Sequence, residues 1–223
     1  MSSINPTLLE LRQVSVMQIK KRTDRGNDLF ELAMYVVAAI CLVFFLIKGE
    51  TAKVMEAALI IGVLLLIRIV VKITKTPMFA ALRFSILLFI CITMILANEL
   101  GFYGVIPYLD KFEHLFSGVI LCFVGLLIYK KANDRETKKT HNAHVAIWLS
   151  LFFSIAMAGV WEIYEFTTDH LLGLNSQNGS LIDTMTDIIC GTSGAIATSL
   201  YLAVKAKHKK MPLLDDSRSQ DNN

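Results

Sequence analysis

Residues 110–131 read DKFEHLFSGVILCFVGLLIYKK, an apolar run from Leu115 to Tyr129 with acids and a histidine before it and two lysines after it. An apolar run of this length is typical of a helix that crosses a lipid bilayer. The 223-residue chain has five further, predominantly apolar runs, so the sequence predicts an all-α, polytopic membrane protein with six transmembrane helices. These runs are Leu32–Ile47, Ala57–Val71, Met78–Ala97, Val145–Trp161 and Ile188–Val204.

The composition supports the same fold class. Hydrophobic residues make up 54% of the chain and charged residues only 18%, with a mean hydropathy of +0.54. A soluble domain of ordinary composition is about 25% charged. The excess of apolar residues excludes a disordered chain, a nucleic-acid-binding domain and an ordinary cytosolic enzyme. We therefore expect the lipid bilayer to be the main partner, and no nucleic acid.

Basic residues are unequally divided between the two sides of the predicted bundle. Nineteen of the 22 lysines and arginines fall in the N-terminal segment, at the connections after the second and fourth runs, and at the C-terminal end. Because positively charged loops stay in the cytoplasm, we expect both termini there, with the basic loops beside anionic lipid. The expected parts are a cytoplasmic segment at 1–28, a six-helix membrane domain at 29–206 and a disordered cytoplasmic tail at 207–223.

Acidic side chains gather at the opposite side, at the outer ends of the last three runs. Residues 166–186 contain no lysine or arginine, so these acids lack basic partners nearby in the sequence. Each of the three predicted helices carries two ligand-type side chains spaced three or four residues apart, which places each pair on one helix face. The pairs are Asp110 and His114, Glu162 and Glu165, and Asp183 and Asp187.

Small residues continue these faces towards the membrane interior, so we expect the last three helices to pack closely. They are Gly118, Cys122 and Gly125 after His114, Ala158 and Gly159 before Glu162, and Gly191, Gly194, Ala195 and Thr198 after Asp187. Clustered carboxylates in a low dielectric need either protons or a cation. We therefore expect His114, Glu162, Asp183 and Asp187 to hold a divalent ion such as Mg, Mn, Fe or Zn, with Glu165 or Asp110 as general base.

A structural interpretation of these acids stands beside the metal site. Asp110-x-x-Glu113 and Ser180-x-x-Asp183 both fit capping boxes at helix N-termini, where acids are favoured by the helix dipole. That interpretation does not explain Glu162 and Glu165, which lie near a helix C-terminal end. Glu99 and His170 are weaker members of the predicted site.

The order Asp110-x-x-x-His114-x-x-x-Gly118, Glu162-x-x-Glu165 and Asp183-Thr184-x-x-Asp187 resembles the YjdF-like family of bacterial inner-membrane proteins. The resemblance spans about half of the chain, from Glu99 to Ala203. It implies a multi-pass protein of the bacterial cytoplasmic membrane. The family is largely uncharacterised, so the resemblance implies no reaction.

Three functions are compatible with a site at the outer surface. The first is a metal-dependent enzyme that acts on a lipid head group or an envelope precursor, with the metal activating water. The second is a transporter of an ion or small solute, although the span centres lack carboxylates and coupled transporters usually bind near the midplane. The third is an accessory protein in which the acidic cluster serves helix packing.

Overall fold

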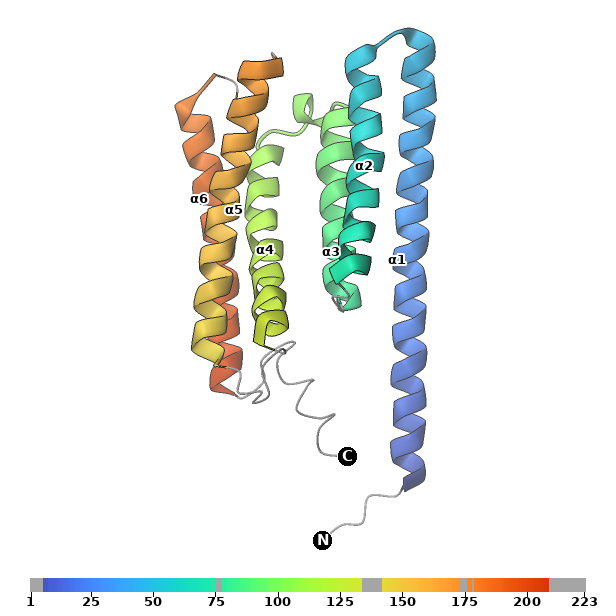
Figure 1. The fold of residues 1–223 in the computed structure, drawn as a ribbon, viewed down its shortest axis with the longest axis vertical. Coiled ribbons are helices and arrows are strands. Elements are labelled where there is room, and N and C mark those ends of the chain that lie inside the picture. The colour runs from blue at the N-terminus through green and yellow to red at the C-terminus, as the bar shows by residue number, and fades with distance from the viewer. Residues whose placement is uncertain (1–5, 75–77, 134–141, 173–175, 178, 209–223) are drawn as a thin grey trace. The chain divides into compact units, whose positions relative to one another are not determined.

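The computed structural model describes residues 6–74, 78–133, 142–172, 176–177 and 179–208, with side chains from residue 23 onward. The described chain is helical throughout and contains no strand. Six of its helices are long and apolar enough to cross a membrane, which confirms the predicted fold class. The elements are α1 (Pro6–Lys48), α2 (Thr51–Thr74), α3 (Ala80–Ile90), the π-helix η1 (Cys91–Glu99), the short 3-10 helix η2 (Phe102–Gly104), α4 (Leu109–Asn133), α5 (Ala143–Leu172) and α6 (Leu181–Lys207) (Figure 1).

The helices extend beyond the apolar runs from which they were predicted. Helix α1 begins at Pro6, so most of the expected N-terminal segment is continuous with the first span. Helix α5 continues past Trp161 to Leu172 and therefore carries Glu162 and Glu165 on regular helix. The expected tail at 207–223 lies outside the described residues except for its first two positions.

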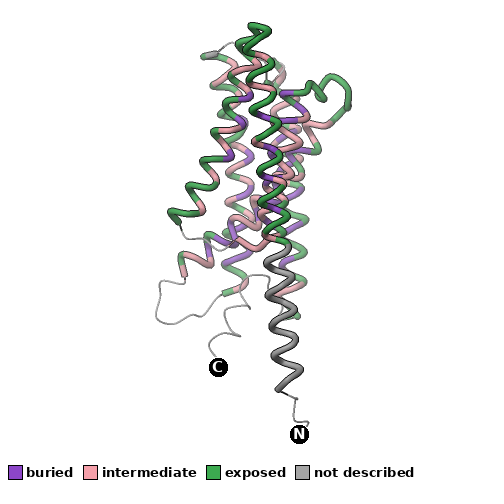
Figure 2. Tube along the Cα trace, turned by 90° about the vertical axis from the view of Figure 1, so that its right-hand side faces the viewer, coloured by how far each residue is buried: buried purple, intermediate pink, exposed green. Residues whose placement is uncertain are grey.

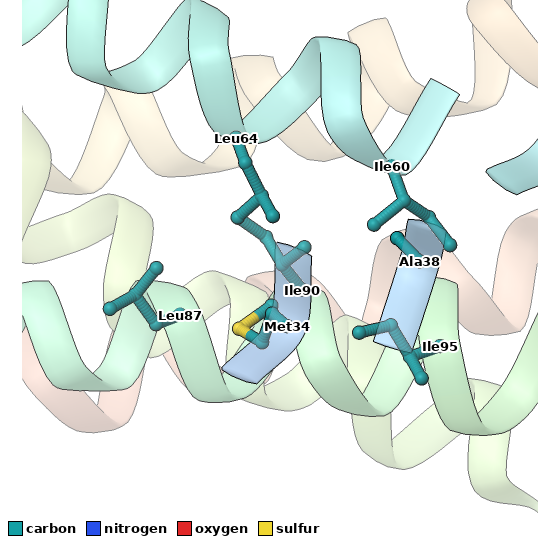
Figure 3. Packing of buried hydrophobic residues seen from close by; sticks show 7 residues of the cluster. All are labelled: Met34, Ala38, Ile60, Leu64, Leu87, Ile90 and Ile95. Carbon is teal, nitrogen blue, oxygen red and sulfur yellow. The ribbon is translucent and has the colours of Figure 1, made fainter. Parts of the chain in front are cut away.

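The chain divides into two compact units, Met1–Gly101 and Phe102–Asn223. In the first unit, α1, α2, α3 and η1 pack around an apolar core (Figure 3). Each helix contributes side chains at helical spacing to this core, which explains why the four elements stay together. The core residues are Met34, Ala38, Ile60, Leu64, Leu87, Ile90 and Ile95.

The second unit is an antiparallel bundle of α4, α5 and α6, in which close contacts depend on glycine. A Cβ atom on Gly118 would overlap the backbone carbonyl of Gly191, and one on Gly194 would overlap that of Leu115. Helices α4 and α6 therefore approach closely, as the small residues predicted. Gly159 is different, because a Cβ added there would meet nothing within 4 Å.

Polar contacts and lipid-facing residues complete this bundle. The hydroxyl of Ser154 in α5 donates to the Gly118 carbonyl of α4 at 2.8 Å, and Cys122 contacts Ser199 of α6 at 3.5 Å. Large apolar side chains such as Trp148, Phe152 and Leu200 are exposed. Exposed positions recur along the lengths of the helices (green in Figure 2). Exposed apolar side chains are expected on helices surrounded by lipid.

Candidate metal centre

The start of α4, the end of α5 and the start of α6 meet at one end of the second unit (Figure 1). The buried imidazole of His114 lies at the centre of this meeting point. Its Nε2 atom is 3.4 Å from Asp110 Oδ1, 3.8 Å from Glu162 Oε1 and 3.8 Å from Asp187 Oδ1. Three carboxylates from three helices therefore surround one ring nitrogen, as the spacing of the acids predicts.

These separations fit ligands around a small cation. One ligand atom each from Asp110, His114 and Asp187 lie within 4.8 Å of one another. Two ligand atoms that each lie about 2.1 Å from a tetrahedral ion are roughly 3.4 Å apart. The 3.8 Å contacts of His114 with Glu162 and Asp187 are longer than direct hydrogen bonds. The three side chains thus form a group that could hold one metal ion, and Asp110 is also close enough to His114 for a direct hydrogen bond.

Glu162 adds a buried oxygen that lacks a donor. The residue is only 4% exposed, and its Oε1 atom has no hydrogen-bond partner among the described residues. Its other oxygen, Oε2, accepts a long bond of 3.4 Å from Gln177 Nε2. A buried carboxylate oxygen without a donor is costly unless a cation compensates it. Glu162 therefore brings a third carboxylate, with one unpaired oxygen, close to His114.

Lys111 is the functional residue that the sequence analysis missed. Its ammonium lies 2.5 Å from Asp183 Oδ1, 2.7 Å from Asp187 Oδ1 and 3.1 Å from Asp110 Oδ2. The expectation that the acids lack a basic partner is therefore wrong, because α4 carries one to α6. A signal was present, since Lys111 is the only lysine or arginine between Arg83 and Lys130.

The predicted capping boxes have different outcomes. Ser180 is the N-cap of α6 and its hydroxyl accepts from the Asp183 backbone N–H at 3.3 Å, as predicted. The box proposed from Asp110 to Glu113 is wrong because α4 begins at Leu109, which places Asp110 inside the first turn. Both Asp110 and Asp183 direct their carboxylates to Lys111 instead.

Glu113 pairs with a tyrosine that precedes α4. The hydroxyl of Tyr103 donates to Glu113 Oε2 at 2.6 Å. Partial burial raises the pKa of Tyr103 above its usual value, and the adjacent charges of Glu113, Asp110 and Glu165 raise it further. The tyrosine therefore stays protonated and serves as a hydrogen-bond donor at the edge of the site.

The other predicted residues lie at or away from this centre. Glu165 is half-buried and accepts a bond of 2.8 Å from Trp161 Nε1, one turn earlier on α5. His170 is exposed and its ring nitrogen contacts the Phe166 carbonyl of its own helix. Glu99 belongs to the first unit.

Comparison with known proteins agrees with the helical architecture. A family described as "Predicted membrane protein (DUF2238)" matches residues 30–208, from the first span to the end of α6. The chain belongs to the DUF2238 family. The match includes every residue of the centre, from Asp110 to Asp187. No curated protein and no solved structure matches the chain.

Proposed function

We propose that the second unit binds a divalent cation through Asp110, His114, Glu162 and Asp187. The observation that carries this proposal is the arrangement of three carboxylate oxygens within 4 Å of the His114 ring nitrogen. Charge supports it as well. Four carboxylates, those of Asp110, Glu162, Asp183 and Asp187, lie around this nitrogen and the Lys111 ammonium. One ammonium does not balance four ionised carboxylates, and a divalent ion would reduce the remaining negative charge.

The donor set restricts the kind of ion. One imidazole and carboxylate oxygens suit Mn, Fe or Zn, and Mg less well because Mg prefers an oxygen shell with several waters. In this arrangement Asp110, first considered as a base, lies among the ligands. Asp183, first considered as a ligand, is held by Lys111 at 2.5 Å.

The position of the centre suggests the class of substrate. It lies where α4 and α6 begin and α5 ends, and these ends border the polar face of a bilayer if the helices span it. A metal there would activate water or polarise a phosphate or carbonyl oxygen of a lipid head group or an envelope precursor. Glu165, one turn from Glu162 on the same helix, is our candidate general base.

Lys111 supports a structural alternative. Its ion pairs join α4 to Asp183 and Asp187 of α6 without any metal. In that case the cluster serves helix packing in an accessory protein. A transporter has less support, because buried polar residues deep in this bundle are hydroxyls such as Ser150, Ser154 and Thr198 rather than charged groups.

Metal analysis of the full chain, purified in detergent, tests the proposal. After equilibration with Mn²⁺ or Zn²⁺ and removal of free ions, we expect about one ion per wild-type chain and a loss of at least tenfold in affinity for Asp187→Asn. Asp169→Asn is the matched control, because Asp169 accepts from the backbone amides of Ser176 and Gln177 and lies outside the donor set. Wild-type protein that binds neither ion would overturn the metal centre and leave the structural alternative.

Location and partners belong to the same proposal. The unequal distribution of lysine and arginine supports a bacterial cytoplasmic membrane with both termini inside. The motif order from Asp110 to Asp187 supports the narrower YjdF-like affiliation. A cavity of about 420 Å³ in the first unit is lined by Arg68, Lys72 and Arg83 together with Asp24 and Glu31. Because Arg68 and Arg83 already bind Glu31, the support for anionic lipid comes from the basic loops rather than from this cavity.

A further inference from the structure

The first unit contains a second ionisable site, independent of the proposed metal centre. Glu99 is the last residue of the π-helix η1 and is only 3% exposed. Neither of its carboxylate oxygens accepts a hydrogen bond from an N–H or hydroxyl donor among the residues whose side chains are described, and its side-chain neighbour is the carboxyl group of Glu56. A buried ionisable group in a membrane helix is a candidate for function, because its charge must be compensated.

The neighbours of Glu99 compensate this charge incompletely. Lys53 and Glu56 of α2 are its charged neighbours, and the Cys41 thiol of α1 lies within its electrostatic influence. The Lys53 ammonium donates to Glu56 Oε2 at 2.6 Å and to the Asn98 carbonyl at 2.7 Å. Two ionised carboxylates and one ammonium carry a net charge of −1, so one further positive charge would make the group neutral.

The chemistry of the site favours a proton over a metal ion. Sodium, calcium and magnesium ions take several oxygen ligands, whereas two carboxylates, Glu99 and Glu56, are neighbours at this site among the described residues. A proton needs only one oxygen and removes the cost of burying an unpaired carboxylate. The exposed fractions of Lys53 and Glu56 are 30% and 38%, so both charged neighbours of the buried Glu99 are themselves accessible from outside the helices.

We propose that Glu99 carries an exchangeable proton, and that Glu56 and Lys53 form its route to solvent. On release, the O–H bond of the Glu99 carboxyl breaks, the proton passes to the Glu56 carboxylate and then to water, and Glu99 becomes an anion beside Lys53. The π-helix that ends at Glu99 agrees with this role, because such segments are rare and occur frequently at functional sites.

Labelling with dicyclohexylcarbodiimide tests the proposal, since this lipid-soluble reagent adds to protonated carboxyl groups in apolar surroundings. The full chain in lipid vesicles is labelled between about pH 6 and pH 9, and the modified residue is identified by mass spectrometry. We expect labelling at Glu99 that falls at least tenfold as the pH rises. Glu31 is the matched control, because it is equally buried at 3% but paired with Arg68 and Arg83, so it should remain unlabelled.

Three further measurements sharpen the test. Glu99→Gln mimics the protonated acid, so it should fold with an unchanged unfolding midpoint and lose the label. Lys53→Met removes a positive charge and should raise labelling at pH 8 several-fold, whereas Lys48→Met should not. Absence of label at Glu99 at every pH, or equal label at Glu31, would overturn the proposal. Protection by sodium relative to choline at constant pH would overturn the proton in favour of a sodium ion.

Discussion

Replacing Lys111 by methionine should increase the metal affinity of the centre. The ammonium lies 2.7 Å from Asp187 Oδ1, and a metal–oxygen bond is about 2.1 Å, so a bound ion would lie at most about 4.8 Å from it. At that separation a single charge repels a divalent ion by about 1.7 kcal/mol in water and by several times more in a lower dielectric. Since Lys111 is 23% exposed, we use the lower figure, which corresponds to an affinity gain of roughly 20-fold.

The metal-free variant should also be less stable than the wild type. Loss of the ammonium leaves Asp183 and Asp187 without their shared cation, and breaking a buried pair in this way costs about 3–5 kcal/mol. Added metal restores the missing charge. The unfolding midpoint of Lys111→Met should therefore rise more with metal than that of the wild type.

Isothermal titration calorimetry with Mn²⁺ or Zn²⁺ measures the affinity, and thermal unfolding in detergent with and without the ion measures the stability. Lys111→Arg keeps the charge and is the matched control, while Lys130→Met removes a lysine from the opposite end of α4. Unchanged or weaker binding in Lys111→Met would refute the reasoning that Lys111 competes with the ion. Instability that metal does not relieve would favour the structural alternative.

Three other predictions concern stability. Gly118→Val should lower the free energy of unfolding, measured by titration in detergent, by at least 1–3 kcal/mol, because its side chain would overlap the Gly191 backbone. Gly159→Ala should have little effect, and equal losses in the two variants would contradict the packing. Tyr103→Phe should lower the free energy of unfolding by about 1–2 kcal/mol, because it removes the donor to Glu113. Amide hydrogen exchange at the start of α4 should become faster, and unchanged exchange would argue against the bond. Glu31→Gln should lower the free energy of unfolding by about 3 kcal/mol, because buried Glu31 accepts from Arg68 and Arg83. The control is Glu56→Gln, which breaks the more exposed pair with Lys53. Equal thermal unfolding midpoints for the two variants would disprove the prediction.

Much of the architecture follows from local properties of the sequence. Apolar runs predict helical spans because a helix satisfies its backbone hydrogen bonds internally, which lipid cannot do. The order of the spans then brings together the start of α4, the end of α5 and the start of α6. The spacing of Asp110 and His114 predicts a shared helix face, and the 3.4 Å approach confirms it. The glycines at 118, 191 and 194 predict close packing for the same local reason.

Other features of the centre depend on the rotation of the helices and on the reach of long side chains. A lysine can extend in many directions, so nothing local indicates that Lys111 crosses to α6 and contacts Asp183 and Asp187. The same rotation leaves Asp183 to the lysine. The contact between Asp110 and His114 follows from their spacing on α4, whereas the pairing of Asp183 with Lys111 joins two helices and cannot be read from spacing within one helix.

The sequence by itself determined the six spans, the acidic ends and the small residues that let α4 and α6 meet, because each is a property of one segment and its solvent. Only the tertiary structure decided which charges compensate one another. It pairs Lys111 with three aspartates, and it leaves the Oε1 atom of Glu162 and both carboxylate oxygens of Glu99 buried without a donor among the described residues. Charge compensation in a low dielectric depends on distances between helices, and those distances are set by packing rather than by order along the chain.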